Sequence, residues 1–221
     1  SSVTLLLWTQ LADSRDGALA LTTQLGDQAA AAQLFDSAGQ HAEAECAQIG
    51  IGVAQAARSA RWMSALLCND PCQRAAPDAL ARGRGGAPVL WSAGISGDRP
   101  IILLRLGEAD DLSRVNEVLQ AQQHWRSQQF AVDVVLLQAA GEARQAALDP
   151  LVSAQQARLK VDDQLPKAEL FALRDDAISE DLRNGLLTVA RVVLDGAPPA
   201  QAAAGSSPAL AAPAAIRATA M

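Results

Sequence analysis

An apolar run that follows a tight, glycine-containing turn constrains the fold of this chain more than any other feature. Residues 89–106 read VLWSAGISGDRPIILLRL. Gly94 and Gly97 allow a turn with positive φ, and Pro100 suits the first position of a strand because it has no N–H to donate to a neighbour. The unbroken apolar run from 101 to 104 is typical of a strand covered on both faces, as in a parallel sheet between helices. This stretch is therefore expected to be the first strand of an α/β unit.

Strand and helix patterns alternate after this turn. Two further apolar runs predict strands, and three amphipathic stretches with capping residues predict helices. The predicted strands cover residues 132–137 and 169–173, and the predicted helices cover residues 111–128, 142–158 and 179–194. Crossovers of this length imply parallel strands joined in the right-handed sense. The sequence therefore predicts a small α/β domain over residues 77–196, built as a three-stranded, mainly parallel βαβαβα unit.

The first 76 residues show no such alternation. Residues 2–9 (SVTLLLWT) predict one strand with no partner nearby, so the segment 1–12 is expected to be an orphan strand whose sheet lies upstream. Helical periodicity follows, with helices expected at 13–24, 28–47 and 53–67. Asp70 and Pro71 then stop the third helix. We therefore predict a helical connector over residues 13–76.

Residues 197–221 consist mainly of Ala, Pro, Gly and Ser. Such a segment buries too little apolar area to offset the entropy lost on ordering. The sequence therefore predicts a disordered tail or linker at this end.

The charge of the chain excludes two classes of partner. Its net charge is −6, whereas nucleic acids and anionic membranes attract clustered Lys and Arg. No apolar run approaches the roughly 20 residues that span a bilayer. We therefore expect a cytoplasmic, soluble segment that binds no nucleic acid and does not insert into a membrane.

The three cysteines and two histidines predict no metal site. Cys46, Cys68 and Cys72 form no C-x-x-C pair, and a zinc site would have only His41 and His124 to complete it. Reduced thiols are the simpler interpretation. We expect no metal and no cofactor.

Ser96 is the one candidate nucleophile in the turn. A nucleophile elbow reads G-x-S-x-G and connects a strand to a helix, whereas Gly94 to Gly97 reads G-x-S-G and enters a strand. Neither histidine carries a signal that pairs it with this serine. We therefore interpret Gly94, Ser96, Gly97 and Pro100 as a structural turn and assign no catalytic residue.

Three residues of the same stretch are candidate carbohydrate contacts. Trp91 could stack on a glucose ring, and Asp98 and Arg99 could bind sugar hydroxyls or a phosphate. The alternative is structural: Trp91, like Trp125, would belong to the core, and the two charged residues would brace the turn.

A loop before the turn leaves a second function class open. Arg82 to Gly86 is basic and rich in glycine and could cradle a phosphate, although the dinucleotide fingerprint requires a strand before its glycines and a helix after them. A hinge is the alternative. With the turn at Gly94 to Asp98, this loop supports a free-standing small α/β enzyme or a nucleotide- or phosphate-binding protein.

Four segments carry a resemblance to a known family. Residues 90–101 read LWSAGISGDRPI and resemble a signature of the large bacterial cyclic β-1,2-glucan synthases, in which LWAYGISGDLPI recurs. Ser92-Ala93 stand in place of Ala-Tyr, and Arg99 stands in place of Leu, so the turn lacks the family's tyrosine. Three further matches occur in the family's order, at residues 14–21 (SRDGALAL), 69–71 (NDP) and 190–196 (ARVVLDG).

The resemblance implies a place within a larger enzyme. That family builds β-1,2-glucan from UDP-glucose at the bacterial inner membrane and cyclises it, and its sandwich and helical-barrel modules are similar to inverting glycoside phosphorylases such as cellobiose phosphorylase. This chain would correspond to the connector between those modules, with the strand at 2–9 as the last strand of a β-sandwich. The resemblance therefore implies a non-catalytic interdomain segment that positions glucan-handling domains. Its partners would be other domains of the same polypeptide, together with β-glucan chains.

Overall fold

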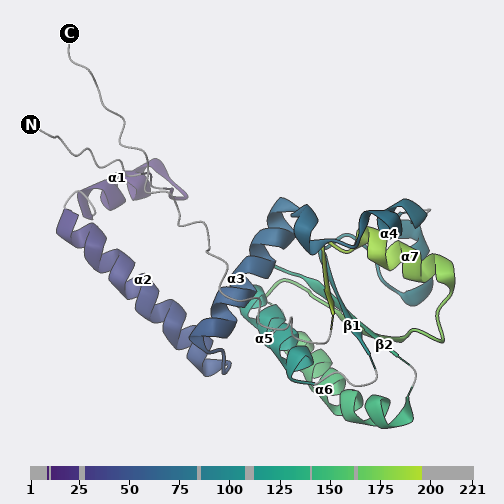
Figure 1. The fold of residues 1–221 in the computed structure, drawn as a ribbon. Coiled ribbons are helices and arrows are strands. Elements are labelled where there is room, and N and C mark those ends of the chain that lie inside the picture. The colour runs from purple at the N-terminus through teal and green to yellow at the C-terminus, as the bar shows by residue number, and fades with distance from the viewer. Residues whose placement is uncertain are drawn as a thin grey trace, which may run out of the picture. The chain divides into compact units, whose positions relative to one another are not determined.

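The computed structural model describes residues 9, 11–24, 28–83, 86–107, 112–139, 141–161 and 164–195 (Figure 1). The chain divides into two compact units, Ser1–Gly52 and Val53–Met221. The predicted strand at 2–9 lies, apart from Thr9, outside the described residues. The predicted tail at 197–221 also lies outside them.

The first unit contains two helices, α1 (Arg15–Gln24) and α2 (Gln28–Gln48). Ser14 caps the first of them, because its hydroxyl accepts the N–H of Gly17 at 3.1 Å. The helices predicted at 13–24 and 28–47 are confirmed.

The second unit is built on a sheet of four parallel strands. They are β1 (Ile101–Leu106), β2 (Asp133–Gln138), β3 (Leu170–Arg174) and β4 (Val192–Asp195), in the order β3-β2-β1-β4. The run from 101 to 104 is fully buried in the central strand β1, which confirms the predicted α/β class. Because all four strands are parallel, they begin at one edge of the sheet, here called the amino edge, and end at the opposite carboxyl edge.

The fourth strand corrects the predicted three-stranded unit. The helix predicted at 179–194 ends earlier, since α7 spans Glu180–Val189 and Ala190 is extended with φ −58° and ψ 127°. The sequence VARVVL was read as a helical stripe, but its β-branched residues favour a strand once a partner is available. Here the partner is β1, which pairs with β4 along residues 192–195.

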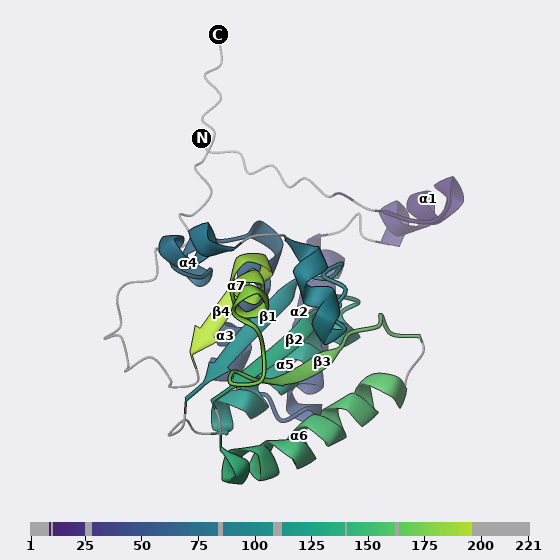
Figure 2. The same cartoon turned by 90° about the vertical axis from the view of Figure 1, so that its right-hand side faces the viewer.

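Three helices cover one face of the sheet: α3 (Val53–Cys68), α5 (Ser113–Ser127) and α6 (Glu142–Val161) (Figures 1 and 2). Their apolar side chains form one core with alternate residues of the strands. Among its most buried members are Leu66, Leu104, Val118, Trp125, Leu136 and Leu148. The structure therefore packs α3 on the sheet of the second unit, whereas the assignment of residues 13–76 as a connector between neighbouring domains stays a prediction.

The opposite face of the sheet is covered by α4 (Pro77–Arg82), the 3₁₀ helix η2 (Ala87–Ala93) and α7. Between α3 and α4 lies the 3₁₀ helix η1 (Pro71–Gln73), which Asp70 caps by accepting the N–H of Cys72 at 2.9 Å. The crossovers through α5 and α6 use one face, and the crossover through α7 uses the other. This is the doubly wound arrangement, with its switch point between β1 and β4.

Two helix boundaries differ from the prediction. The helix predicted at 142–158 ends later, because α6 runs without interruption through Pro150 to Val161. The helix predicted at 111–128 corresponds to α5, which begins after Leu112; residue 111 lies outside the described residues, and Leu112 makes no side-chain capping bond.

Candidate functional site

The turn before β1 lies at the amino edge of the sheet. Gly94 and Gly97 have φ values of +74° and +79°, in the region that favours glycine. The hydroxyl of Ser96 accepts the N–H of Asp98 at 3.3 Å, and Nε1 of Trp91 donates to the carbonyl of Ser96 at 3.1 Å. The polar groups of the turn therefore bond to one another and close it.

The two tryptophans that the sequence offered as core residues have different environments. Trp125 is 1% exposed in the core beneath α5, which confirms its structural interpretation. Trp91 is 63% exposed on η2, so its expected place in the core is wrong. A proline in its first turn and Gly94 at its end set the bounds of this short helix, which buries Leu90 and leaves Trp91 exposed. A stacking role for Trp91 stays a prediction.

Arg99 bonds to a residue that the sequence analysis did not select. Its Nη1 lies 3.3 and 3.4 Å from the two carboxylate oxygens of Asp133, the first residue of β2. The same carboxylate accepts the N–H of Glu169 at 2.9 Å, and the N–H of Asp133 donates to the carbonyl of Pro100 at 3.0 Å. One buried side chain thus joins the starts of β1, β2 and β3. A charged residue inside the apolar run VDVVLL was the sequence signal for it.

Burial raises the pKa of Asp133 above its usual value of 3.8, and this effect exceeds the opposing influence of the Glu169 N–H and of Arg99. The folded protein therefore holds this proton more tightly than the unfolded chain. Between pH 3.8 and the raised pKa the native state binds more protons, so the contribution of Asp133 to stability falls as pH rises through this window.

Unfolding measurements at several pH values test whether the contribution of Asp133 to stability falls as the pH rises. Relative to Asp133→Asn, the parent protein is expected to lose free energy of unfolding as pH rises from about 3.5 to 6, because only the parent must ionise a buried carboxyl. Urea unfolding of both proteins at several pH values measures the difference, in which the other titrating groups cancel. The raised pKa would be contradicted if the free energy of unfolding of the parent, relative to that of Asp133→Asn, stayed constant or increased as the pH rises.

Two buried glutamines extend the polar contacts at the amino edge. Nε2 of Gln122 donates to the carbonyls of Val132 and Glu169 at 2.9 and 2.8 Å. Nε2 of Gln155 donates to Oε1 of Gln122 at 3.0 Å and to the carbonyl of Leu119 at 3.2 Å. These bonds fix α5 and α6 to each other and to the starts of β2 and β3. They stabilise the edge and leave Gln122 occupied within the protein.

The structure does not bring Ser96 to an imidazole. His124 lies on α5 with its Nε2 3.1 Å from Nε2 of Gln128, and His41 lies in the first unit, 3.4 Å from Oε1 of Glu45. In the described part of the chain, no hydrogen bond of Ser96 reaches either histidine. The geometry therefore shows no serine–histidine pair of the kind that activates a nucleophile.

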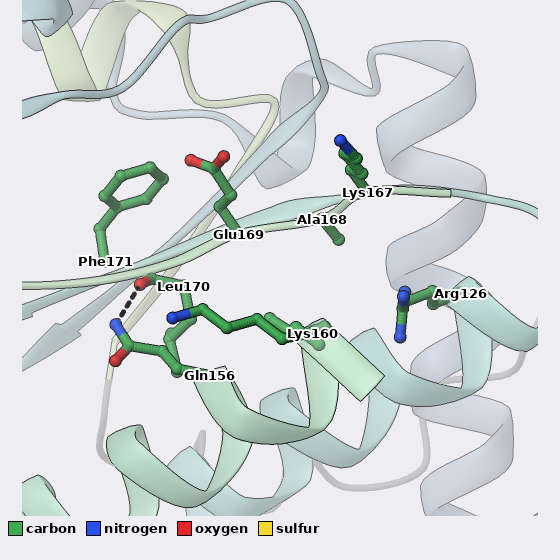
Figure 3. Close-up of a pocket in the computed structure, with 9 residues that line it drawn as sticks. Arg126, Gln156, Lys160, Lys167, Ala168, Glu169, Leu170 and Phe171 are labelled. Atoms are coloured by element: carbon green, nitrogen blue, oxygen red, sulfur yellow. Dashed lines mark hydrogen bonds between the residues drawn. The ribbon is translucent and has the colours of Figure 1, made fainter. Parts of the chain in front are cut away.

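One cavity, of about 520 Å³, lies at the amino edge beside β3 (Figure 3). The two lysines of the chain both line it, and Figure 3 shows Lys160 extending along β3 toward Leu170. Nε2 of Gln156 donates to the carbonyl of Leu170 at 3.0 Å, which places an α6 side chain on the outer edge of the sheet. The charged and polar residues of the lining are Arg126, Gln156, Lys160, Lys167 and Glu169.

A second cavity, of about 480 Å³, lies at the carboxyl edge of β2 and β3. Ligands of open α/β sheets usually bind at this edge, outside the ends of the strands. The polar residues that line the cavity come from η2, β2, α6, β3 and the start of α7. They are Ser92, Gln138, Gln145, Asp149, Arg174 and Ser179. None of the turn residues between 94 and 100 lines it.

Metal ligands and reactive thiols do not gather in the described residues. Within those ranges, no group of three or more His, Cys, Asp or Glu side chains could hold a metal ion. None of the three cysteines forms a disulfide bond in the described part of the chain. None of the helices there is both long enough and apolar enough to cross a membrane.

The strand order and the helices on both faces define the second unit as an open, doubly wound α/β unit. Polar cavities lie at the amino and the carboxyl edge of its sheet. No protein-family model matches the chain. The chain is similar to the cyclic β-(1,2)-glucan synthase NdvB of Rhizobium meliloti (strain 1021), with 27% identity over 199 residues. This match covers 86% of the chain but 7% of the synthase, so the chain spans a small part of that relative.

Proposed function

We propose that this chain is a non-catalytic interdomain segment of a protein related to cyclic β-1,2-glucan synthases, and that it positions the domains that handle glucan. The observation that carries the proposal is the match to such a synthase, which extends over 86% of this chain and 7% of the synthase. In this proposal the partners are other domains of the same polypeptide and β-glucan chains, and the whole protein lies at the bacterial inner membrane.

The contacts of the turn support a positioning role. The side chain of Arg99 is bound to Asp133, and the hydroxyl of Ser96 is bound to the backbone of the turn itself. Residues that must bind and transform a substrate need groups free to reach it, whereas these groups hold strand ends together. Asp98 is exposed and stays a candidate carbohydrate contact, as does Trp91.

A turnover assay tests the non-catalytic part. The 221-residue chain, incubated with UDP-glucose or with β-1,2-gluco-oligosaccharides and phosphate, is expected to release no UDP and no glucose 1-phosphate above background. Turnover of either substrate that disappears with Ser96→Ala or Asp98→Ala would reject the proposal.

A domain exchange tests the positioning part. We expect a glucan synthase of the matched family to keep producing cyclic glucan when its corresponding segment is replaced by this chain. Replacement by a flexible Gly/Ser linker of equal length is expected to abolish cyclisation, because such a linker holds no fixed geometry. Equal activity of the two replacements would show that no particular structure is needed here.

A second candidate function, phosphate or nucleotide binding, is favoured by one observation. Lys160 and Lys167 line the same amino-edge cavity, together with Arg126, in a chain whose net charge is −6. The loop first considered for this role contains residues 84 and 85, which lie outside the described residues. A rise in Tm with phosphate that is lost in Lys160→Ala/Lys167→Ala would favour this candidate over the first.

A further inference from the structure

Besides its location at the carboxyl ends of the strands, the cavity at the carboxyl edge contains an unpartnered polar atom that points to a ligand. Gln138 is the last residue of β2 and is 5% exposed, yet its Oε1 has no hydrogen-bond partner among the described residues. Buried polar atoms in proteins almost always have a partner, because leaving one without a hydrogen bond is costly. Oε1 is therefore an acceptor that a bound molecule can satisfy once the Gln138 side chain turns toward the cavity.

Gln138 is one of the residues that line the cavity. Val134 and Leu136 lie in the core beneath α5 and α6, and alternation along β2 puts Gln138 on the same side. Beyond the end of the strand this side is lined by Gln145 and Asp149, from the first two turns of α6. Ser179 and Leu182 of α7 line the cavity from the other side of the sheet.

The charges of the lining disfavour an anion. Arg174 is its cation, and its guanidinium is bound by both carboxylate oxygens of Asp176 at 3.0 and 2.6 Å. Asp149 adds a negative charge, and the first turn of α7 carries Glu180 and Asp181. A phosphate or carboxylate would meet this negative field without a free counter-charge. A neutral molecule that donates hydrogen bonds therefore fits this lining and the Gln138 acceptor better than an anion does.

The apolar residues of the lining complete the chemical description. Leu173, Ile178 and Leu182 give the cavity a hydrocarbon wall opposite its hydrogen-bonding groups. A sugar ring has hydroxyl donors around its edge and C–H groups on its faces, so it fits both surfaces. The volume of about 480 Å³ lies within the range of roughly 300–1,000 Å³ found for small-molecule sites.

We infer that the carboxyl-edge cavity is a sugar-binding site in which a ring hydroxyl donates to Oε1 of Gln138, with Asp149 as a second acceptor. The ligand class follows from the cavity alone. Only the choice of β-1,2-linked glucose as the first ligand to try rests on the proposed function.

Calorimetric titration of the full chain with sophorose, the β-1,2-linked glucose disaccharide, tests this site. Gln138→Leu keeps the volume but removes the acceptor, so we expect the affinity to fall by at least about tenfold. The side-chain amide of Gln138 is expected to shift in nitrogen–proton NMR spectra of the parent as sophorose is added. Gln156→Leu, which alters the amino-edge cavity, is the matched control and is expected to bind sophorose like the parent.

Stability measurements separate loss of the ligand from loss of the fold. Because the Gln138 oxygen is unpartnered, Gln138→Leu is expected to leave Tm unchanged or to raise it. Gln122→Leu removes three side-chain hydrogen bonds and is expected to lower Tm. Sophorose binding that survives in Gln138→Leu would overturn the site. So would the absence of binding by sophorose, maltose and cellobiose alike, or competition by inorganic phosphate.

Titration with the three disaccharides sophorose, maltose and cellobiose also distinguishes the sugar site from the proposed role in β-1,2-glucan handling. Binding of maltose or cellobiose without sophorose, lost in Gln138→Leu, would support the sugar site and count against a role in β-1,2-glucan handling. Binding of sophorose above the other two would support both.

Discussion

Replacing Asp133 with alanine is expected to lower the free energy of unfolding of this protein by about 2–3 kcal/mol, because a buried acceptor with two partners is removed. The Asp133 side chain is 1% exposed and binds Arg99 from the turn and the N–H of Glu169 from the start of β3. Without it, that N–H loses its partner and the guanidinium, which is 28% exposed, loses its counter-charge. For a domain of this size the change corresponds to a fall in Tm of roughly 4–12 °C.

Two matched substitutions make this result specific. Asp133→Asn keeps an oxygen for the Glu169 N–H and is expected to lose about 1 kcal/mol or less. Asp98→Ala, at an exposed neighbour in the turn, is expected to stay within about 0.5 kcal/mol. Thermal and urea unfolding measure all three. An Asp133→Ala protein as stable as Asp98→Ala would show that the three strand starts do not depend on this carboxylate.

Replacing Gly83 with alanine is expected to destabilise the second unit by about 2 kcal/mol through a steric clash. A Cβ added at Gly83 would overlap Oγ1 of Thr188 on α7 and would lie 2.7 Å from its Cβ. Rotation of the threonine side chain can move its hydroxyl but not its Cβ, so α4 and α7 must separate. The backbone is not the cause, because φ at Gly83 is −66°, which alanine adopts readily.

A double-mutant cycle isolates this clash. Thr188→Gly removes the opposing Cβ, so the cost of Gly83→Ala is expected to shrink in that background, although Thr188→Gly carries its own helix penalty of about 1 kcal/mol. Gly52→Ala is the control, since a Cβ there meets nothing within 4 Å. If Gly83→Ala costs the same with and without Thr188, the contact between α4 and α7 is not the source of the effect.

The sequence predicted those elements whose burial can be inferred from their own pattern of apolar residues. The run from 101 to 104 is apolar at every position and directly follows Pro100, as is typical of a strand covered on both faces, and the structure buries it in the sheet. The helical periods at 13–24 and 28–47 likewise predicted α1 and α2. In contrast, β4 could be read either way, because the short apolar run of residues 192–194 fits a helix end as well as a strand.

The candidate sites were harder to predict because their residues are distant in sequence. Arg99 was selected, but its partner lies 34 residues away, and nothing local predicts that pairing. Gln138 carries no motif at all. It was selected because its buried Oε1 has no hydrogen-bond partner among the described residues, and because it lines a cavity together with residues of η2, α6 and α7.

The sequence by itself determined the class of this protein: alternating apolar runs and amphipathic helices require parallel strands between helical layers, because each apolar surface must be covered. Only the tertiary structure decided the strand order β3-β2-β1-β4, the change of α7 to the opposite face and the two cavities at the strand ends. The physical reason is that strand pairing and cavity lining depend on contacts between residues far apart along the chain. The periodicity of a segment shows only which of its own residues share a face.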